Sequence, residues 1–256
     1  MTQPKTWIAG VVFIAILLVG NLSAKAAENE TTCGLDKDKF EELKTIQNST
    51  KLSYLEQIKQ ELRIRRELLR ATTNCATDEA RTLYANLNGI NTSDQDIKRL
   101  QTKLSGQLDN GINYYELQKS KIDDLGLNGS RIFARDLADW REGNYKPTAR
   151  TAQSLIIWSR NQDILQAAQK RFDQLNRAVN LLKIVDSDEI QNIWEEARNN
   201  FRVANDDNQK AAALLRATEN PDTTLSAIHS SLAALSKTYQ KFFELNEVLS
   251  EVLPSH

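Results

Sequence analysis

Residues 165–182 read LQAAQKRFDQLNRAVNLL, and this stretch decides the fold. Its apolar residues recur at alternating steps of three and four, which places them on one stripe of an α-helix. They are Leu165, Ala168, Phe172, Leu175, Val179 and Leu182. A helix over residues 148–185, which follow Pro147, would be roughly 57 Å long at 1.5 Å per residue. A rod of this length cannot bury its stripe alone, so the chain must supply long partner helices.

Two partner helices follow directly. Asp186-Ser187-Asp188 caps the first partner, whose stripe is Ile190, Trp194, Ala197, Phe201, Ala204, Asn208, Ala211 and Leu215. Asn220-Pro221-Asp222 ends it and begins the second partner, whose stripe is Leu225, Ile228, Leu232, Leu235, Tyr239, Phe242, Leu249 and Leu253. The short turns make neighbouring helices antiparallel. Residues 148–253 are therefore predicted to form an up-down-up three-helix coiled coil, which resembles spectrin-type repeats in length and helix count. Asn208 is polar, and we expect it to set the register.

The first half of the chain carries shorter stripes of the same kind. A helix from Asp36 is predicted from the spacing of Phe40, Leu43 and Ile46. Ser53 and Glu56 have the spacing of a capping box and begin a second helix. We expect a third helix to restart at Thr77 and to end at Gly89, where a glycine follows the last turn. A fourth, long helix follows the cap Thr92-Ser93-Asp94.

These patterns predict an all-α fold, a long antiparallel helical bundle. Residues 27–126 are predicted to form an N-terminal helical unit. Residues 127–147 are predicted to form a connector, with a break in the helix from Arg141 to Pro147. The connector would join the N-terminal unit to the three-helix unit over residues 148–253.

Composition excludes some functions and favours long helices. The 256 residues include 9 Gly and 4 Pro, with 40% hydrophobic and 26% charged residues. Few glycines and prolines are typical of long helical elements. The net charge is -1, from 33 basic and 34 acidic residues. This balance argues against nucleic acid as a partner, because such binding needs a cationic face that displaces counterions.

The N-terminus has the pattern of an export signal. Lys5 precedes an apolar run from Trp7 to Val19, and Ala24-Lys25-Ala26 has the small-x-small pattern of a cleavage site. Residues 1–26 are therefore predicted to be a signal peptide. The alternative is an uncleaved membrane anchor, because the uncharged stretch approaches the ~20 residues that span a bilayer. Either way, the remaining chain is expected to be extracytoplasmic: secreted, periplasmic or at the cell surface.

Cys33 and Cys75 are the only two cysteines. In an exported chain an even pair favours a disulfide. An unbroken helix would hold the two residues about 60 Å apart, whereas a disulfide needs Cα atoms within roughly 7 Å. We therefore predict that the chain reverses at the polar segment Asn48–Ser53 and forms a helical hairpin that Cys33–Cys75 closes. The alternative is one continuous helix with free thiols or an intermolecular bridge.

The sequence predicts no enzyme, no metal site and no cofactor. His229 and His256 are the only histidines, and neither has a Glu three residues before it, as a di-iron bundle requires. The Cys-x-x-Cys spacing that lowers a thiol pKa is missing, as is the clustering of Cys and His typical of zinc sites. No Gly-rich phosphate loop follows a strand.

The leading hypothesis is an exported, non-enzymatic helical-bundle protein of the cell envelope or extracellular space, acting as a structural or adaptor component. One alternative is a helical binding protein or holdase chaperone for an apolar ligand or client. Another is a coiled-coil protein anchored by residues 1–26. A protein partner is expected, and the stripes also permit self-association.

Four residues form the most recognition-like cluster of the sequence: Trp140, Arg141, Tyr145 and Lys146. Aromatic residues and arginine are favoured at interaction hot spots, so these four are candidate partner contacts. The simpler interpretation is that the aromatic rings close the end of a bundle, since an ordered connector must bury something.

Overall fold

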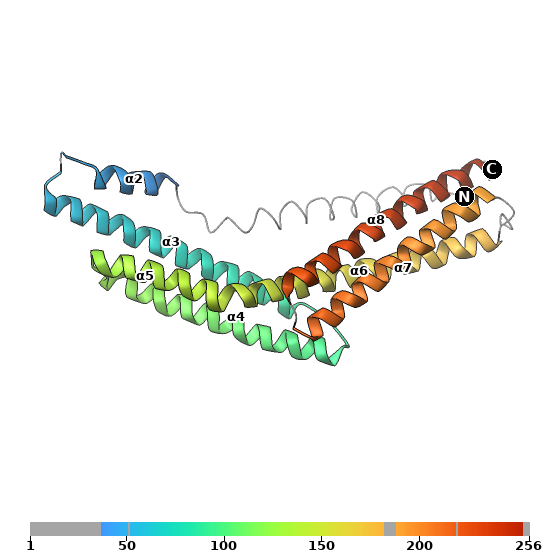
Figure 1. The fold of residues 1–256 in the computed structure, drawn as a ribbon, viewed down its shortest axis with the longest axis horizontal. Helices are drawn as coiled ribbons and strands as arrows, with labels where there is room; N and C mark the ends of the chain where they lie inside the picture. Colours follow the sequence, from blue (N-terminus) through green and yellow to red (C-terminus); the bar gives the residue numbers. More distant parts are fainter. Residues whose placement is uncertain (1–36, 51, 182–187, 219, 253–256) are drawn as a thin grey trace, which may run out of the picture. The chain divides into compact units, whose positions relative to one another are not determined.

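The computed structural model confirms an all-α fold and describes residues 37–50, 52–181, 188–218 and 220–252. The described helices are α2 (Lys37–Gln47), α3 (Tyr54–Asn88), α4 (Gln95–Lys121), the 3-10 helix η2 (Ile122–Asp124), α5 (Leu127–Trp140), the π-helix η3 (Arg141–Tyr145), α6 (Lys146–Leu181), α7 (Asp188–Arg216) and α8 (Pro221–Val252) (Figure 1). None of these helices is long and apolar enough to span a membrane. The predicted signal segment and Cys33 lie outside the described residues.

The chain divides into two compact units. The first comprises residues up to Arg81 together with Asn110–Arg141, and the second comprises Thr82–Asp109 together with the chain from Glu142 onward. Helices α3 and α4 therefore contribute residues to both units. One boundary, between Arg141 and Glu142, lies inside the predicted connector 127–147.

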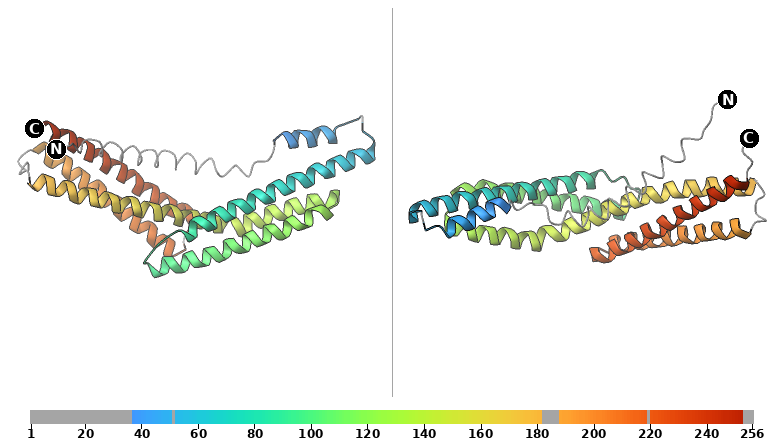
Figure 2. Two further views of the ribbon diagram at one scale, coloured as in Figure 1. Left: turned by 180° about the vertical axis from the view of Figure 1, so that it is seen from behind. Right: turned by 90° about the horizontal axis from the view of Figure 1, so that it is seen from above.

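The second unit contains the predicted three-helix arrangement. Helices α7 and α8 pack against each other, and α6 packs against both, with the up-down-up order visible in Figures 1 and 2. One core cluster holds Leu175, Ile190, Trp194, Ala197, Phe242 and Leu245, and a second holds Leu165, Ala168, Ala204, Ala234 and Leu235. Phe172 stacks on Trp194 with ring centroids 4.2 Å apart. The stripes read from the sequence are thus the surfaces that meet.

A buried polar layer joins the three helices of this unit. The Asn161 Nδ2 atom on α6 donates a hydrogen bond to Asn208 Oδ1 on α7, at 2.9 Å, and another to Ser231 Oγ on α8, at 2.9 Å. Ser231 Oγ in turn donates to the carbonyl oxygen of Ala204 at 2.6 Å. All three side chains are at most 1% exposed. Because a buried amide must find its partner, this layer favours one axial register of the helices.

The structure confirms two predicted helix starts. The backbone N–H of Glu56 donates to Ser53 Oγ at 3.3 Å. The backbone N–H groups of Asp96 and Ile97 donate to Asp94 Oδ1 at 3.0 and 3.1 Å. Each side chain thus satisfies N–H groups that a first helical turn leaves without intrahelical partners.

Two predicted breaks are wrong. Helix α3 does not restart at Thr77 but continues from Tyr54 to Asn88. The hydroxyl groups of Thr73 and Thr77 donate to the carbonyl oxygens of Leu69 and Thr73, at 2.8 Å each. These polar side chains are therefore satisfied inside the helix and need not cap a new one.

The second wrong break is the one expected from Arg141 to Pro147. The chain stays helical from Leu127 to Leu181, with the π-helix η3 at Arg141–Tyr145 just before Pro147. A proline inside an α-helix lacks an N–H group and clashes with the carbonyl four residues earlier, which here belongs to Gly143. The wider π turn contains Gly143 and relieves that conflict, so the helix continues.

The polar layer gives a test of how the second unit is specified. We expect Asn208→Leu to lower the free energy of unfolding by about 1–3 kcal/mol, because it removes a hydrogen-bond acceptor of the buried Asn161 amide. The double variant Asn161→Leu/Asn208→Leu should recover most of this loss, since no buried amide then lacks its partner. Urea unfolding of the four chains in a double-mutant cycle measures the coupling. Additive losses would contradict the role of the layer.

Candidate functional site: an apolar groove

The first unit is built around the N-terminal part of α3. Helix α2 lies antiparallel on α3, with Lys39 Nζ 2.7 Å from Glu67 Oε2 and Arg63 Nη2 3.0 Å from Glu42 Oε1. Helix α5 runs parallel to α3, since Arg131 reaches Glu61 at its start and Arg141 reaches Glu79 at its end. The chain reverses between α2 and α3, as the polar segment Asn48–Ser53 predicts (Figure 1).

Helix α2 fills part of the trough between α3 and α5. Phe40, Leu43 and Leu52 pack against the buried side chains of Ile46, Ile64 and Leu68. However, α2 has 11 residues and α3 has 35. Because α2 is described from Lys37 and Lys39 pairs with Glu67, the described α2 ends opposite the middle of the trough.

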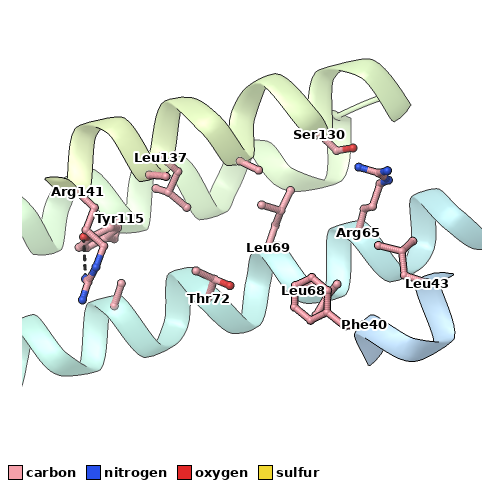
Figure 3. Close-up of a pocket in the computed structure, with 13 residues that line it drawn as sticks. Phe40, Leu43, Arg65, Leu68, Leu69, Thr72, Tyr115, Ser130, Leu137 and Arg141 are labelled. Atoms are coloured by element: carbon pink, nitrogen blue, oxygen red, sulfur yellow. Dashed lines mark hydrogen bonds between the residues drawn. The ribbon is translucent and has the colours of Figure 1, made fainter. Parts of the chain in front are cut away.

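An apolar groove with a volume of about 330 Å³ lies where α2 ends. It is lined by Phe40, Leu43, Arg65, Leu68, Leu69, Thr72, Ala76, Tyr115, Ser130, Ala134, Leu137, Ala138 and Arg141. In Figure 3, Leu69, Thr72 and Leu137 lie between α3 and α5, while Phe40 and Leu43 come from α2 at one side. Such a volume lies within the range of ligand-binding clefts. The groove is the candidate functional site.

Two guanidinium groups lie at opposite ends of the groove, and both are paired with carboxylates (Figure 3). Arg65 Nη2 lies 2.6 Å from Glu61 Oε1. At the other end, Arg141 Nη2 lies 2.6 Å from Glu79 Oε2, and its Nη1 donates to the Tyr115 hydroxyl at 3.3 Å. Burial lowers the pKa of Arg141, but the hydrogen bond to Glu79 outweighs this and raises it. The charges at the ends are thus compensated, and the groove between them is apolar.

Glu61 ties the three helices at one end of the groove together. Its carboxylate accepts a hydrogen bond from Gln47 Nε2 on α2 at 2.9 Å and from Arg65 on α3, and it lies 3.5 Å from Arg131 on α5. Burial raises the pKa of Glu61, but the bonds from Gln47 and Arg65 outweigh it, so the net pKa is lowered. The ionised form therefore stabilises the folded state.

The four predicted partner contacts are separated by the structure. Trp140 stacks on Tyr114 with ring centroids 3.7 Å apart and meets the edge of Tyr115. Arg141 lines the groove. Tyr145 and Lys146 belong to the second unit, where Tyr145 is 2% exposed and Lys146 Nζ lies 2.5 Å from Glu142. Trp140 and Tyr145 thus serve internal packing, while the expected partner contact itself stays a prediction.

Sequence reasoning missed the groove residues on α3 and α5. The signal that indicates them is a mismatch of lengths, because the first predicted stripe ends after Ile46 while the stripes opposite it continue. A long stripe with a short partner leaves an apolar strip uncovered.

A second hollow, of about 550 Å³, lies in the second unit beside Trp158. Its lining is largely polar, and the ion pair of Arg216 Nη2 with Asp94 Oδ2, at 2.5 Å, crosses the turn before α4. The hydrogen bond from Arg216, with the backbone N–H of Ile97, lowers the pKa of Asp94. These contacts join the cap of α4 to α7, so we assign the hollow a structural role.

Reactive groups are sparse in the part of the chain that the structure describes. No cluster of three His, Cys, Asp or Glu side chains suited to a metal ion occurs there. His229 is exposed on α8, and Cys75 is half-buried on α3. His256 lies outside the described residues, as does Cys33, so the predicted disulfide stays a prediction.

Comparisons with protein-family models, with curated proteins and with solved structures found no match to this chain.

The network of Glu61 predicts a pH dependence of stability. Since the folded-state pKa lies below the unfolded one, the stabilisation is present above the usual Glu pKa of about 4.3 and is lost as pH falls through it. Glu61→Gln should lower the free energy of unfolding by about 1–2 kcal/mol at pH 7, and by less at pH 3. The exposed Glu56→Gln on the same helix is the control. Equal losses for Glu61→Gln at both pH values in urea unfolding would refute this assignment.

Proposed function

We propose that this chain is an exported, non-enzymatic helical-bundle interaction protein of the cell envelope or extracellular space, and that its groove holds an amphipathic polypeptide segment. The observation that carries this proposal is the trough between α3 and α5. Its first half already holds an amphipathic helix, α2, and its second half offers a continuous apolar surface. The protein thus acts by presenting a surface, as an adaptor does.

The lining favours a polypeptide segment over a compact small molecule. Ala76, Ala134 and Ala138 have short side chains, so a helix or extended chain can approach the backbones of α3 and α5 closely. The leucines beside them supply apolar contacts at helical spacing. An amphipathic helix laid in an apolar groove is a recurrent mode of peptide recognition.

Filling the groove tests this function. The probe is a fluorescently labelled helical peptide of Leu and Lys, with leucines at positions i, i+3, i+4 and i+7, added to the full chain with its cysteines reduced. Ala138→Trp places a large ring in the groove and should weaken peptide binding by on the order of tenfold or more, because the ring occupies the binding surface. Fluorescence anisotropy measures the affinity.

Ala71→Trp is the matched control, since Ala71 is exposed on α3 and does not line the groove. It should bind the peptide as the wild type does. Binding that is equal in the two variants would show that the groove is not the docking surface.

Export and the Cys33–Cys75 bond are tested by one measurement, the intact mass of the protein purified from its own host envelope. We expect a mature chain that begins at Ala27, with thiols that react with an alkylating agent only after reduction, and with no doubling of mass. A full-length chain with two reactive thiols would contradict both predictions and favour the membrane-anchored alternative.

A further inference from the structure

We propose that the groove's resident occupant is the chain's own segment just before α2, residues 27–36, with Leu35 in the groove and Cys33 bonded to Cys75. This deepens the proposed function, on which it rests, because it names what covers the docking surface before a partner arrives. Four observations support it: the register of α2 on α3, the face on which Cys75 lies, the position of Leu35 and the length of the segment.

The register of the α2–α3 hairpin carries the first step. Three side-chain pairs join the helices, residue 39 with 67, 42 with 63 and 47 with 61, so that the paired numbers add to between 105 and 108. In an antiparallel pair this total stays constant, since both helices rise 1.5 Å per residue. Residues 33 and 75 add to 108, within the same range. The hairpin therefore directs Cys33 toward Cys75.

The face of α3 carries the second step. Ile64 and Leu68 face α2, and Thr72 lines the groove. Cys75 follows Thr72 by three residues, after steps of four and four, so it lies on the same stripe. On the other strand of the hairpin, Cys33 precedes Phe40 by seven residues, or about two turns. Both cysteines thus continue the surfaces that already meet.

Leu35 carries the third step, since it is the one large apolar residue between Ala27 and Asp36. Helix α2 is described from Lys37, and Asp36 is a residue type favoured at the N-cap. With Asp36 as the N-cap, Leu35 and Phe40 occupy the two positions of a hydrophobic staple. Phe40 lines the groove, so the staple brings Leu35 to it. By the register above, Leu35 falls opposite the turn of α3 that contains Thr72.

The segment is also long enough to cover the groove. From Glu67, which pairs with Lys39, to Glu79, which pairs with Arg141, α3 rises about 18 Å at 1.5 Å per residue. Ten residues span about 15 Å as a helix and up to about 33 Å when extended. Residues 27–36 therefore reach from the start of α2 to the far end of the groove.

The covalent bond makes access to the groove dependent on redox conditions. When Cys33 and Cys75 join, their two thiols lose two protons and two electrons, which a disulfide-bearing exchange partner accepts as it becomes a dithiol. The S–S bond then holds the segment over the groove. A dithiol reductant reverses the exchange, restores both thiols and leaves the segment free to be displaced by an amphipathic partner.

Cysteine cross-linking in the full chain tests the placement of Leu35. In a Cys33→Ala/Cys75→Ala background, the pair L35C/T72C should form a disulfide on mild oxidation, as read by intact mass and non-reducing electrophoresis. The control is L35C/N74C, because Asn74 is exposed, lies two residues from Thr72 and points to the opposite side of α3. The L35C/T72C bond should form in on the order of tenfold excess, since a docked segment raises the effective concentration of the two thiols.

Equal bond formation in the two pairs, or none in L35C/T72C, would overturn the proposal whatever the peptide does. A separate arm compares the labelled Leu/Lys peptide on the oxidised and the reduced wild-type chain, and we expect weaker binding when the bond is closed. If L35C/T72C bonds selectively but the peptide binds neither form, the segment is placed and the proposed partner-binding function fails. If the peptide binds both forms equally, the segment does not control the groove, and the redox part of the proposal is wrong.

Discussion

The burial of the apolar stripe of α3 is the constraint on which the first unit depends. A helix of 35 residues presents such a stripe over its whole length, and an isolated helix gains little stability until that stripe packs against another element. Where α2 lies on it, Ile64 and Leu68 become core residues. Beyond α2, the same stripe becomes the floor of a groove. One chain feature thus produces a core and a docking surface, and the length of the covering helix decides where one changes into the other.

The second unit shows what happens when the lengths match. Helices α6, α7 and α8 have 36, 29 and 32 residues, and their stripes close on one another. Most residues of the α7 stripe are buried, including Asn208. A fully covered core still has several axial registers that bury similar apolar area, and the layer of Asn161, Asn208 and Ser231 penalises those in which the amides lose their partners. Closure and specificity therefore come from different residues.

Periodicity in the sequence predicted the parts of this fold that depend on one stripe facing another. It identified the helices of the second unit, the polar position at Asn208 and the caps at Ser53 and Asp94. It failed where polar residues and proline serve roles inside a helix. The hydroxyls of Thr73 and Thr77 bond within α3, and a π turn before Pro147 absorbs the proline. It also missed the groove, because a stripe shows what a helix must bury but not whether the partner is long enough.

The cysteine pair resolves an energetic difficulty that the groove creates. Burying one leucine contributes about 2 kcal/mol, whereas fixing a single backbone residue costs about 1–2 kcal/mol. Gly34, Leu35 and Asp36 all have to be ordered between Cys33 and α2, so the contact of Leu35 alone does not hold the segment in place. A disulfide that closes a loop of this length adds on the order of 4 kcal/mol by restricting the unfolded chain. Docking of the segment is therefore favourable only with the bond intact. The covered state of the groove is, on this argument, a property of the oxidised chain.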